Sequence, residues 1–208
     1  MMTELTVAIM AGGQSRRMGT DKAFVMLHGK PLVEHLVAKV RHLGQIETIL
    51  ITNRPDAYSF LGLPAYTDVL PGSGSLGGIY TALHYSRTSY VLILACDMPF
   101  VSTPLLKYMV RLTEGDSFDV IVPRVEGYPE SMHAIYRRTC LGPIRARLNA
   151  GQLKVTGFYG EVCVRAIDEP EYQIFDPKGL SFYNVNTPED LARAQQLDQS
   201  GKRAGDSQ

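Results

Sequence analysis

The segment from Gly12 to Lys22 (GGQSRRMGTDK) gathers the residue types that bind a chain of phosphates. Its glycines let backbone N–H groups approach an anion closely and tolerate positive φ. The guanidinium groups of Arg16 and Arg17 can donate bidentate hydrogen bonds to phosphate oxygens, and Lys22 adds a further positive charge. The spacing matches neither the Walker motif nor the G-x-G-x-x-G dinucleotide motif. The segment therefore indicates a polyphosphate site, while a Gly-rich turn with solvated surface cations remains the alternative.

One carboxylate stands where a metal ion could be held. The apolar run Tyr90–Ala95 (YVLILA) is typical of a buried strand, and Asp97 follows it with only Cys96 between them. A carboxylate at the carboxyl end of such a strand can bind Mg²⁺ together with several waters and substrate phosphates. Because Pro99 follows, the aspartate could equally belong to a turn or cap a helix. A polyphosphate loop in the same chain favours the metal, since Mg²⁺ would offset phosphate charge.

Two further polar segments could contact a nucleoside. Asp68 precedes PGSGSLGG, whose four glycines let the backbone pack against a flat base. Its carboxylate could accept hydrogen bonds from a ribose hydroxyl or a base amine, or it could be an exposed turn residue. Asn184 and Asn186 lie on one face of an extended chain. Their amides could contact substrate, water or metal, or they could close a turn before the next helix.

Several other classes of site and partner are not indicated. The five histidines have no metal-ligand spacing, and no G-x-S-x-G elbow is present. Three scattered cysteines without a CxxC pair suit a reducing cytoplasm, and the N-terminus does not read as a secretory signal. Lys plus Arg and Asp plus Glu both number 21, which argues against binding nucleic acid by bulk charge. No apolar run approaches 18 residues. We therefore expect a cytoplasmic protein with neither nucleic acid nor membrane as a partner.

Apolar runs that alternate with helical patterns must position these residues. The expected strands are Leu5–Met10, Ile46–Thr52, Tyr90–Ala95, Asp119–Pro123, Met132–Tyr136 and Cys163–Ile167. The expected helices are 31–43, 77–85, one that starts at 102–104, 138–150 and 188–197. This alternation predicts a three-layer α/β/α sandwich with a mostly parallel, Rossmann-like sheet, in which ligands bind beyond the carboxyl ends of the strands. We expect one domain over residues 1–198 and a disordered tail over 199–208.

The polar segments together resemble one family. MAGGQSRRMGTDKAFVMLHGKPL is similar to the N-terminal signature of sugar-nucleotide-type nucleotidyltransferases, and most closely to that of the molybdenum cofactor guanylyltransferases. The pattern continues in SLGGIYTAL, LACDMPFVS and NVNTPEDLARAQ, so the resemblance spans about Val7 to Gln196. Two stretches depart from it. Ile51 replaces the first Asn of the family's N-x-N-R, with Asn53 matching the second, and PGSGSLGG replaces a shorter P-G-P-L-G-G loop.

The resemblance implies an enzyme that transfers GMP from GTP to the terminal phosphate of Mo-molybdopterin, with Mg²⁺ as cofactor. Its products would be pyrophosphate and the molybdopterin guanine dinucleotide. The resemblance also implies Arg16, Lys22 and Asp97 as catalytic residues, with Asp97 as the Mg²⁺ ligand. The residues implied for nucleotide binding are Met10, Ala11, Gly12, Gly13, Lys22, Asp68, Asp97, Asn184 and Asn186.

Several alternatives stay open at this point. CTP with molybdopterin, or another nucleotide with a sugar phosphate, would use the same fold. A non-catalytic, nucleotide-binding regulatory subunit is an alternative of another class. Other molybdenum cofactor biosynthesis or delivery proteins could be partners. A second anionic substrate could use five cations, which could equally be solvated surface charges: Arg124, Arg137, Arg138, Arg145 and Lys154.

Overall fold

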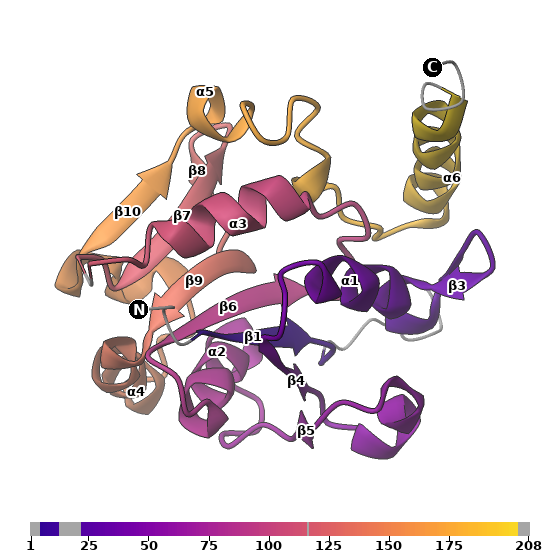
Figure 1. Ribbon diagram of the computed structural model, residues 1–208. Helices are drawn as coiled ribbons and strands as arrows, with labels where there is room; N and C mark the ends of the chain where they lie inside the picture. Colours follow the sequence, from indigo (N-terminus) through magenta and orange to yellow (C-terminus); the bar gives the residue numbers. More distant parts are fainter. Residues whose placement is uncertain (1–4, 13–21, 116, 204–208) are drawn as a thin grey trace.

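The computed structural model describes residues 5–12, 22–115 and 117–203. Within these ranges a central sheet is covered by helices on both faces (Figure 1). The expected α/β/α architecture with a mostly parallel sheet is therefore confirmed. None of the helices in the described ranges combines the length and hydropathy that crossing a membrane requires.

The sheet has the strand order β10-β7-β9-β6-β1-β4-β5. The bounds are β1 Leu5–Met10, β4 Glu47–Ile51, β5 Ala65–Tyr66, β6 Tyr90–Ala95, β7 Val120–Val125, β9 His133–Arg137 and β10 Val164–Ile167. The short strands β2 (Met26–Leu27) and β3 (Lys30–Pro31) form a separate hairpin. The short strand β8 (Tyr128–Pro129) pairs with β7 at a position outside this order.

Strand β9 is the reversed member of this order in the described part of the chain. It is antiparallel to β6 and to β7, whereas the other neighbours along the order are parallel. Its register pairs His133 with Leu94, near the end of β6. The beginning of β9, rather than its end, therefore reaches the edge where the parallel strands end.

The helices form the two outer layers of the sandwich. Their bounds are α1 Leu32–Arg41, α2 Gly74–Tyr85, α3 Thr103–Arg111, α4 Leu141–Asn149, α5 Glu169–Tyr172 and α6 Pro188–Arg203. Five 3₁₀ segments lie in the described ranges: η1 Lys22–Phe24, η2 Pro55–Leu61, η3 Arg138–Cys140, η4 Val155–Glu161 and η5 Leu180–Phe182. Helices α1 and α3 cover one face of the sheet, and α2 and α4 cover the other (Figure 1).

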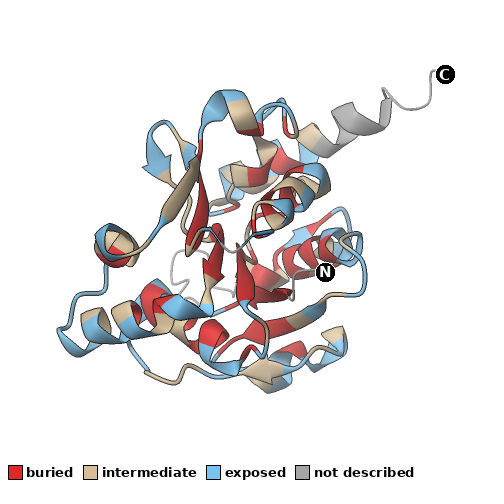
Figure 2. Cartoon of the chain, turned by 60° about the vertical axis from the view of Figure 1, so that its left-hand side comes forward, coloured by how far each residue is buried: buried red, intermediate tan, exposed pale blue. Residues whose placement is uncertain are grey.

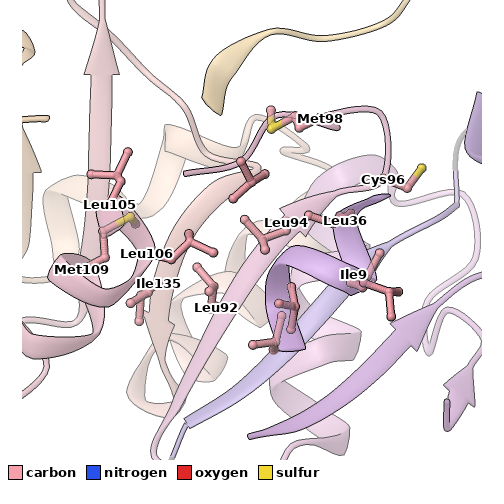
Figure 3. Packing of buried hydrophobic residues seen from close by; sticks show 14 of the residues in the cluster. Ile9, Leu36, Leu92, Leu94, Cys96, Met98, Leu105, Leu106, Met109 and Ile135 are labelled. Atoms are coloured by element: carbon pink, nitrogen blue, oxygen red, sulfur yellow. The ribbon is translucent and has the colours of Figure 1, made fainter. Parts of the chain in front are cut away.

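The burial of both sheet faces explains the continuous apolar strands. On β1, Val7 and Ile9 join the cluster under α1 and α3, whereas Ala8 and Met10 join the cluster under α2 and α4. Strand β6 divides in the same way, and the central strands are buried along their length (Figure 2). Figure 3 shows Ile9 of β1 close to Leu36 of α1, with the β6 side chains packing toward α3. Such strands show no polar alternation because neither face meets water.

Several boundaries differ from the sequence expectation. Helix α1 begins at Leu32 because Pro31 pairs with Met26 in the β2–β3 hairpin. The turn of this hairpin places His28 at φ 47° and Gly29 at φ 78°. Helix α2 begins at Gly74 rather than at Gly77.

Two further boundaries involve the C-terminal half. The expected 138–150 helix divides into η3 and α4, and α6 continues past Leu197 to Arg203. Ser102 caps α3, since its Oγ accepts a hydrogen bond from the Leu105 amide at 3.3 Å. The division into a domain over 1–198 and a tail over 199–208 stays a prediction, and residues 204–208 lie outside the described ranges.

Candidate functional site

A cavity of about 310 Å³ opens at the carboxyl edge of the parallel strands. Its walls come from the ends of β1, β4 and β6, the start of α2 and the approach to β9. Seven of the expected site residues line it: Met10, Ala11, Gly12, Lys22, Asp68, Asp97 and Asn184. Two others, Gly13 and Arg16, lie outside the described residues. The cavity sits where ligands bind in open parallel sheets.

Lys22 joins three segments that are far apart in the sequence. Its ammonium nitrogen lies 3.4 Å from Asp97 Oδ2 and donates a hydrogen bond to Asn186 Oδ1. The Lys22 and Asp97 side chains are about one-fifth exposed, so their charges are less screened than those of a surface pair. The structure thus brings the expected phosphate-binding cation, the expected metal ligand and one expected amide into a single cluster.

The Asn184–Asn186 strip is fastened to the turn that carries Asp97. The buried Val185 between the two asparagines donates its amide to the Asp97 carbonyl oxygen at 2.9 Å. Asn184 turns toward the cavity and donates from Nδ2 to the Phe182 carbonyl oxygen at 3.1 Å. Asn186, in contrast, is exposed and reaches Lys22. The two amides therefore act at different places, although the sequence put them on one face.

Buried hydrogen bonds hold the approach to this strip. Asp176 accepts from the amides of Leu180 and Ser181, at 3.2 and 2.7 Å. Ser181 Oγ in turn accepts from the Ser102 amide at the start of α3. Because Asp176 and Ser181 are both buried, these bonds are protected from water and fix the approach to Asn184.

Asp68 is oriented by the residue that the sequence left without a clear role. Asn53 donates from Nδ2 to Asp68 Oδ2 at 2.9 Å, and the Asp68 amide donates back to Asn53 Oδ1 at 3.2 Å. Ile51, which replaces the family's other asparagine, ends β4 and lines the cavity with an apolar surface. Among the residues that the structure describes, no hydrogen bond engages the other Asp68 carboxylate oxygen.

Two glycines at the start of α2 allow close packing, Gly78 against Met10 of the sheet and Gly77 against the preceding loop. A Cβ at Gly78 would stand 2.4 Å from Met10 Cε, and a Cβ at Gly77 would stand 2.4 Å from Ser73 Cβ. Gly74 opens the helix at φ 58°, a conformation that glycine adopts without strain. The glycine-rich loop therefore places the first turn of α2 directly beside the cavity, where Gly74 and Ser75 line it.

Glu130 and Met132 also line the cavity, and the sequence reasoning missed both. Burial raises the pKa of the Glu130 carboxyl group. No local motif marks these residues, because they precede β9 and reach the site only through its reversed direction. A signal was present only in the order of strands, which a single sequence does not give.

His133, immediately after this wall, is buried in an apolar setting. Neither ring nitrogen has a hydrogen-bond partner among the residues that the structure describes, and the ring lies edge-on to Phe182 with centroids 5.2 Å apart. Burial lowers the pKa of His133 to about 3, because the charged imidazolium would lose its hydration. The residue is therefore neutral at physiological pH and packs from the start of β9 against Phe182 of η5.

The arrangement is suited to binding a phosphate chain beside a metal ion. One half-buried carboxylate, Asp97, with a cation beside it fits the way proteins hold Mg²⁺ through one or two carboxylates, waters and substrate phosphates. Among the described residues no group of three or more His, Cys, Asp or Glu side chains could hold a metal ion alone. The donor set is thus that of a metal shared with substrate.

Comparison with known proteins connects this geometry to a family. Residues 7–162 match the model of the MobA-like NTP transferase domain. A probable molybdenum cofactor guanylyltransferase of Carboxydothermus hydrogenoformans is 37% identical over 192 residues, covering 92% of this chain and 95% of that protein. A molybdenum cofactor guanylyltransferase of Desulfosudis oleivorans is 33% identical over 97% of this chain and 99% of its own length.

A solved structure supports the same relationship. The crystal structure of molybdopterin-guanine dinucleotide biosynthesis protein A from Archaeoglobus fulgidus superposes with a TM-score of 0.81 at 29% identity. The superposition covers 94% of this chain and 99% of that one. The family model spans well over half of the chain, and relatives above 30% identity extend along nearly all of it. This chain therefore belongs to the MobA-like NTP transferase family, together with its molybdenum cofactor guanylyltransferase relatives.

Proposed function

We propose that this protein transfers GMP from GTP to the terminal phosphate of Mo-molybdopterin, forming the molybdopterin guanine dinucleotide and pyrophosphate. A phosphate oxygen of the pterin attacks the α-phosphorus of GTP. The bond from that phosphorus to the bridging oxygen breaks, and pyrophosphate leaves with the electron pair. The attacking phosphate is already ionised at neutral pH, so the reaction needs positioning and charge stabilisation rather than a general base.

The Lys22–Asp97–Asn186 cluster on the edge of a nucleotide-sized cavity is the observation that carries this proposal. Lys22, a cation able to bind phosphate, lies beside Asp97, a carboxylate able to bind a metal ion, and this pairing supports transfer from a nucleoside triphosphate. The family includes relatives named as molybdenum cofactor guanylyltransferases. That name indicates a guanylyl group as the group transferred and the molybdenum cofactor as its acceptor.

Each residue of the cluster has a distinct task in the proposed reaction. Lys22 binds the phosphate groups of GTP and offsets the charge that builds on the leaving pyrophosphate. Arg16, six positions before Lys22 in the sequence, supplies further positive charge. Asp68, oriented by Asn53, accepts hydrogen bonds from the guanosine. Asn184, which lines the cavity next to the residue bonded to Asp97, contacts the substrates, while Asn186 orients the Lys22 ammonium group.

A divalent cation, which we propose to be Mg²⁺, would be held by Asp97. When bound, it offsets the charge of the triphosphate and orients its oxygens. The Val185–Asp97 backbone bond keeps this carboxylate in place, and the half-buried setting limits competition from water. Cytoplasmic location and contacts with delivery proteins stay predictions.

A nucleotide panel tests the proposal. The protein is mixed with Mg²⁺ and GTP, CTP, ATP or UTP, and the shift of its melting temperature is measured. We expect GTP to stabilise it most. Pyrophosphate release is then followed after addition of Mo-molybdopterin, and it should require GTP, Mg²⁺ and the pterin together.

The alternative functions predict different results in the same panel. Preference for CTP would indicate a cytidylyltransferase. Release of pyrophosphate when a sugar phosphate is added in place of Mo-molybdopterin would indicate another acceptor. Stabilisation by GTP without pyrophosphate release would indicate a non-catalytic nucleotide-binding protein. Any of these three results would contradict guanylyl transfer to molybdopterin.

A further inference from the structure

Glu130 and Met132 form a wall of the cavity that none of the phosphate, metal or guanosine assignments uses. Hydrogen bonds fix the backbone of this wall. The Glu130 amide donates to the Pro123 carbonyl oxygen at 2.8 Å, and the Met132 carbonyl oxygen accepts from the Ala95 amide at 3.0 Å. Ser131 between them turns away, since its hydroxyl lies 3.1 Å from that of Tyr159. The wall is therefore a built surface with one carboxyl group and one thioether toward the cavity.

The Glu130 carboxyl group is set up to accept hydrogen bonds from a ligand. It is half-buried, and no described residue donates a hydrogen bond to it or pairs with its charge. Loss of hydration is the cause of its raised pKa. A carboxyl group in this state gains most from a ligand that brings N–H donors, because it has lost water without gaining a protein partner. A phosphate group brings no such donors and would be repelled by the ionised form.

The strand order places Glu130 away from Asp68, the other carboxylate that could accept hydrogen bonds from a heterocyclic base. Asp68 follows β5 at one end of the sheet, Asp97 follows β6 in the middle, and Glu130 precedes β9 on the far side of β6. The cavity thus offers a base-reading carboxylate on each side of the expected metal ligand. A transfer between two molecules requires two subsites, one on each side of the reacting phosphate.

The two heterocycles of the proposed reaction have the same hydrogen-bonding edge. Guanine and pterin each present a ring N–H beside an exocyclic amine, and one carboxylate can accept from both groups. With the guanosine at Asp68, a second carboxylate remains for the pterin. Met132 and the largely buried Met98 are both among the residues that line the cavity, and a thioether is a polarisable contact for an aromatic ring.

Resting on the proposed function, we infer that Glu130 is a substrate-recognition residue for the acceptor: its carboxylate accepts hydrogen bonds from the N–H and amino groups of the pterin, which lies against Met132. The residue determines affinity for the acceptor and takes no part in binding GTP or metal.

Substitution of Glu130 separates this role from the others. Glu130→Ala removes the acceptor, whereas Glu130→Gln keeps its shape and turns one oxygen into a donor that opposes the pterin amine. The matched control is Glu126→Gln, an exposed glutamate of the β7–β8 turn outside the cavity. The Kd for Mo-molybdopterin is measured by ultrafiltration, together with the KM for both substrates and the Mg²⁺ concentration for half-maximal rate.

We expect both Glu130 variants to bind Mo-molybdopterin about tenfold to a hundredfold more weakly, the range for losing hydrogen bonds to a charged group. The KM for GTP, the GTP-dependent melting shift and the Mg²⁺ requirement should match those of the control. Unchanged pterin affinity in an active Glu130→Ala variant would overturn the inference alone. A raised KM for GTP would assign Glu130 to the guanosine, and a raised Mg²⁺ requirement would assign it to the metal, so both results contradict it. A wild-type protein that releases no pyrophosphate would instead refute the proposed function itself.

Discussion

Asn53 and Asp68 hold each other through two hydrogen bonds, side-chain amide to carboxylate at 2.9 Å and backbone amide to side-chain carbonyl at 3.2 Å. Asn53 follows β4 and Asp68 follows β5, so the bonds also tie together two neighbouring strand ends. A substitution at Asn53 should therefore change the orientation of the Asp68 carboxylate without disturbing the hydrophobic core.

Asn53→Ala should weaken GTP binding. Loss of the two bonds leaves Asp68 free to rotate away from the guanosine, and bonds of this kind contribute about 1 kcal/mol each. We expect the Kd for GTP to rise fivefold to tenfold, on the order of that energy, with little change in melting temperature. Asn149→Ala, at an exposed position that ends α4, is the control. Equal GTP affinities in the two variants would show that Asp68 does not bind the guanosine.

Asp97→Asn should abolish metal-dependent turnover while the fold survives. The isosteric amide keeps the shape of the site but loses the charge that holds a divalent cation, and such electrostatic groups contribute roughly a hundredfold or more to rate. Loss of the 3.4 Å pair with Lys22 should cost at most about 1 kcal/mol of unfolding free energy. Pyrophosphate release is the measurement, with Asp168→Asn in an exposed ion pair with Arg124 as the control. Near wild-type turnover at saturating Mg²⁺ would refute the metal role.

Lys22→Ala should weaken GTP binding and slow turnover together. The ammonium group is held toward Asp97 by Asn186, so its removal takes away an oriented positive charge rather than a mobile one. We expect at least a tenfold rise in the Kd for GTP, corresponding to about 1.4 kcal/mol. The control is Lys107→Ala on the exposed side of α3. Binding that does not depend on Lys22, measured by calorimetry, would argue that other groups hold the phosphates.

His133 should make the protein less stable in acid. Its pKa is about 3 in the fold, against 6.5 for an unperturbed histidine, so the unfolded chain binds a proton that the folded chain does not. The stabilisation is complete above about pH 6.5 and is lost as the pH falls toward the folded pKa of about 3. Between pH 7 and 5.5 the unfolding free energy should drop by about 1 kcal/mol from this residue.

Urea unfolding of His133→Leu at both pH values checks this dependence. The variant replaces the buried ring with an apolar side chain and should lose about 1 kcal/mol less than the wild type over the interval. His84→Gln, at an exposed position on α2, should keep the wild-type dependence. Parallel curves for wild type and His133→Leu would mean that the buried ring is not the source.

Two glycine-to-alanine substitutions should change stability in opposite directions. At Gly77 the new methyl group would meet Ser73 Cβ at 2.4 Å and crowd the first turn of α2, which should cost about 1–3 kcal/mol. At Gly142, in α4, the methyl group meets nothing within 4 Å and should stabilise the helix by up to about 1 kcal/mol. Thermal melts of both variants give the comparison. Stabilisation at Gly77 would show that the loop and helix do not pack as described.

The sequence by itself determined the six longer strands, most of the helices and the main site segments, whereas the two-residue strands β2, β3, β5 and β8 were not predicted. Leu5–Met10 and Tyr90–Ala95 are strands at the expected residues. Short apolar runs that contain β-branched residues are typical of strands buried on both faces of a sheet. Gly12, Lys22 and Asp97 lie around one cavity because the parallel strands before them must end at one edge. Local patterns record these features, so a single chain is enough to find them.

Tertiary structure alone decided the remaining contacts. The bonds from Asn53 to Asp68, from Lys22 to Asn186 and from Val185 to Asp97 join residues 15, 164 and 88 positions apart. Glu130 reaches the cavity only because β9 runs against its neighbours, which brings its beginning to the edge where β6 ends. Strand direction and order depend on which apolar faces pack together across the whole sheet, and that free energy is a property of the folded chain rather than of any segment.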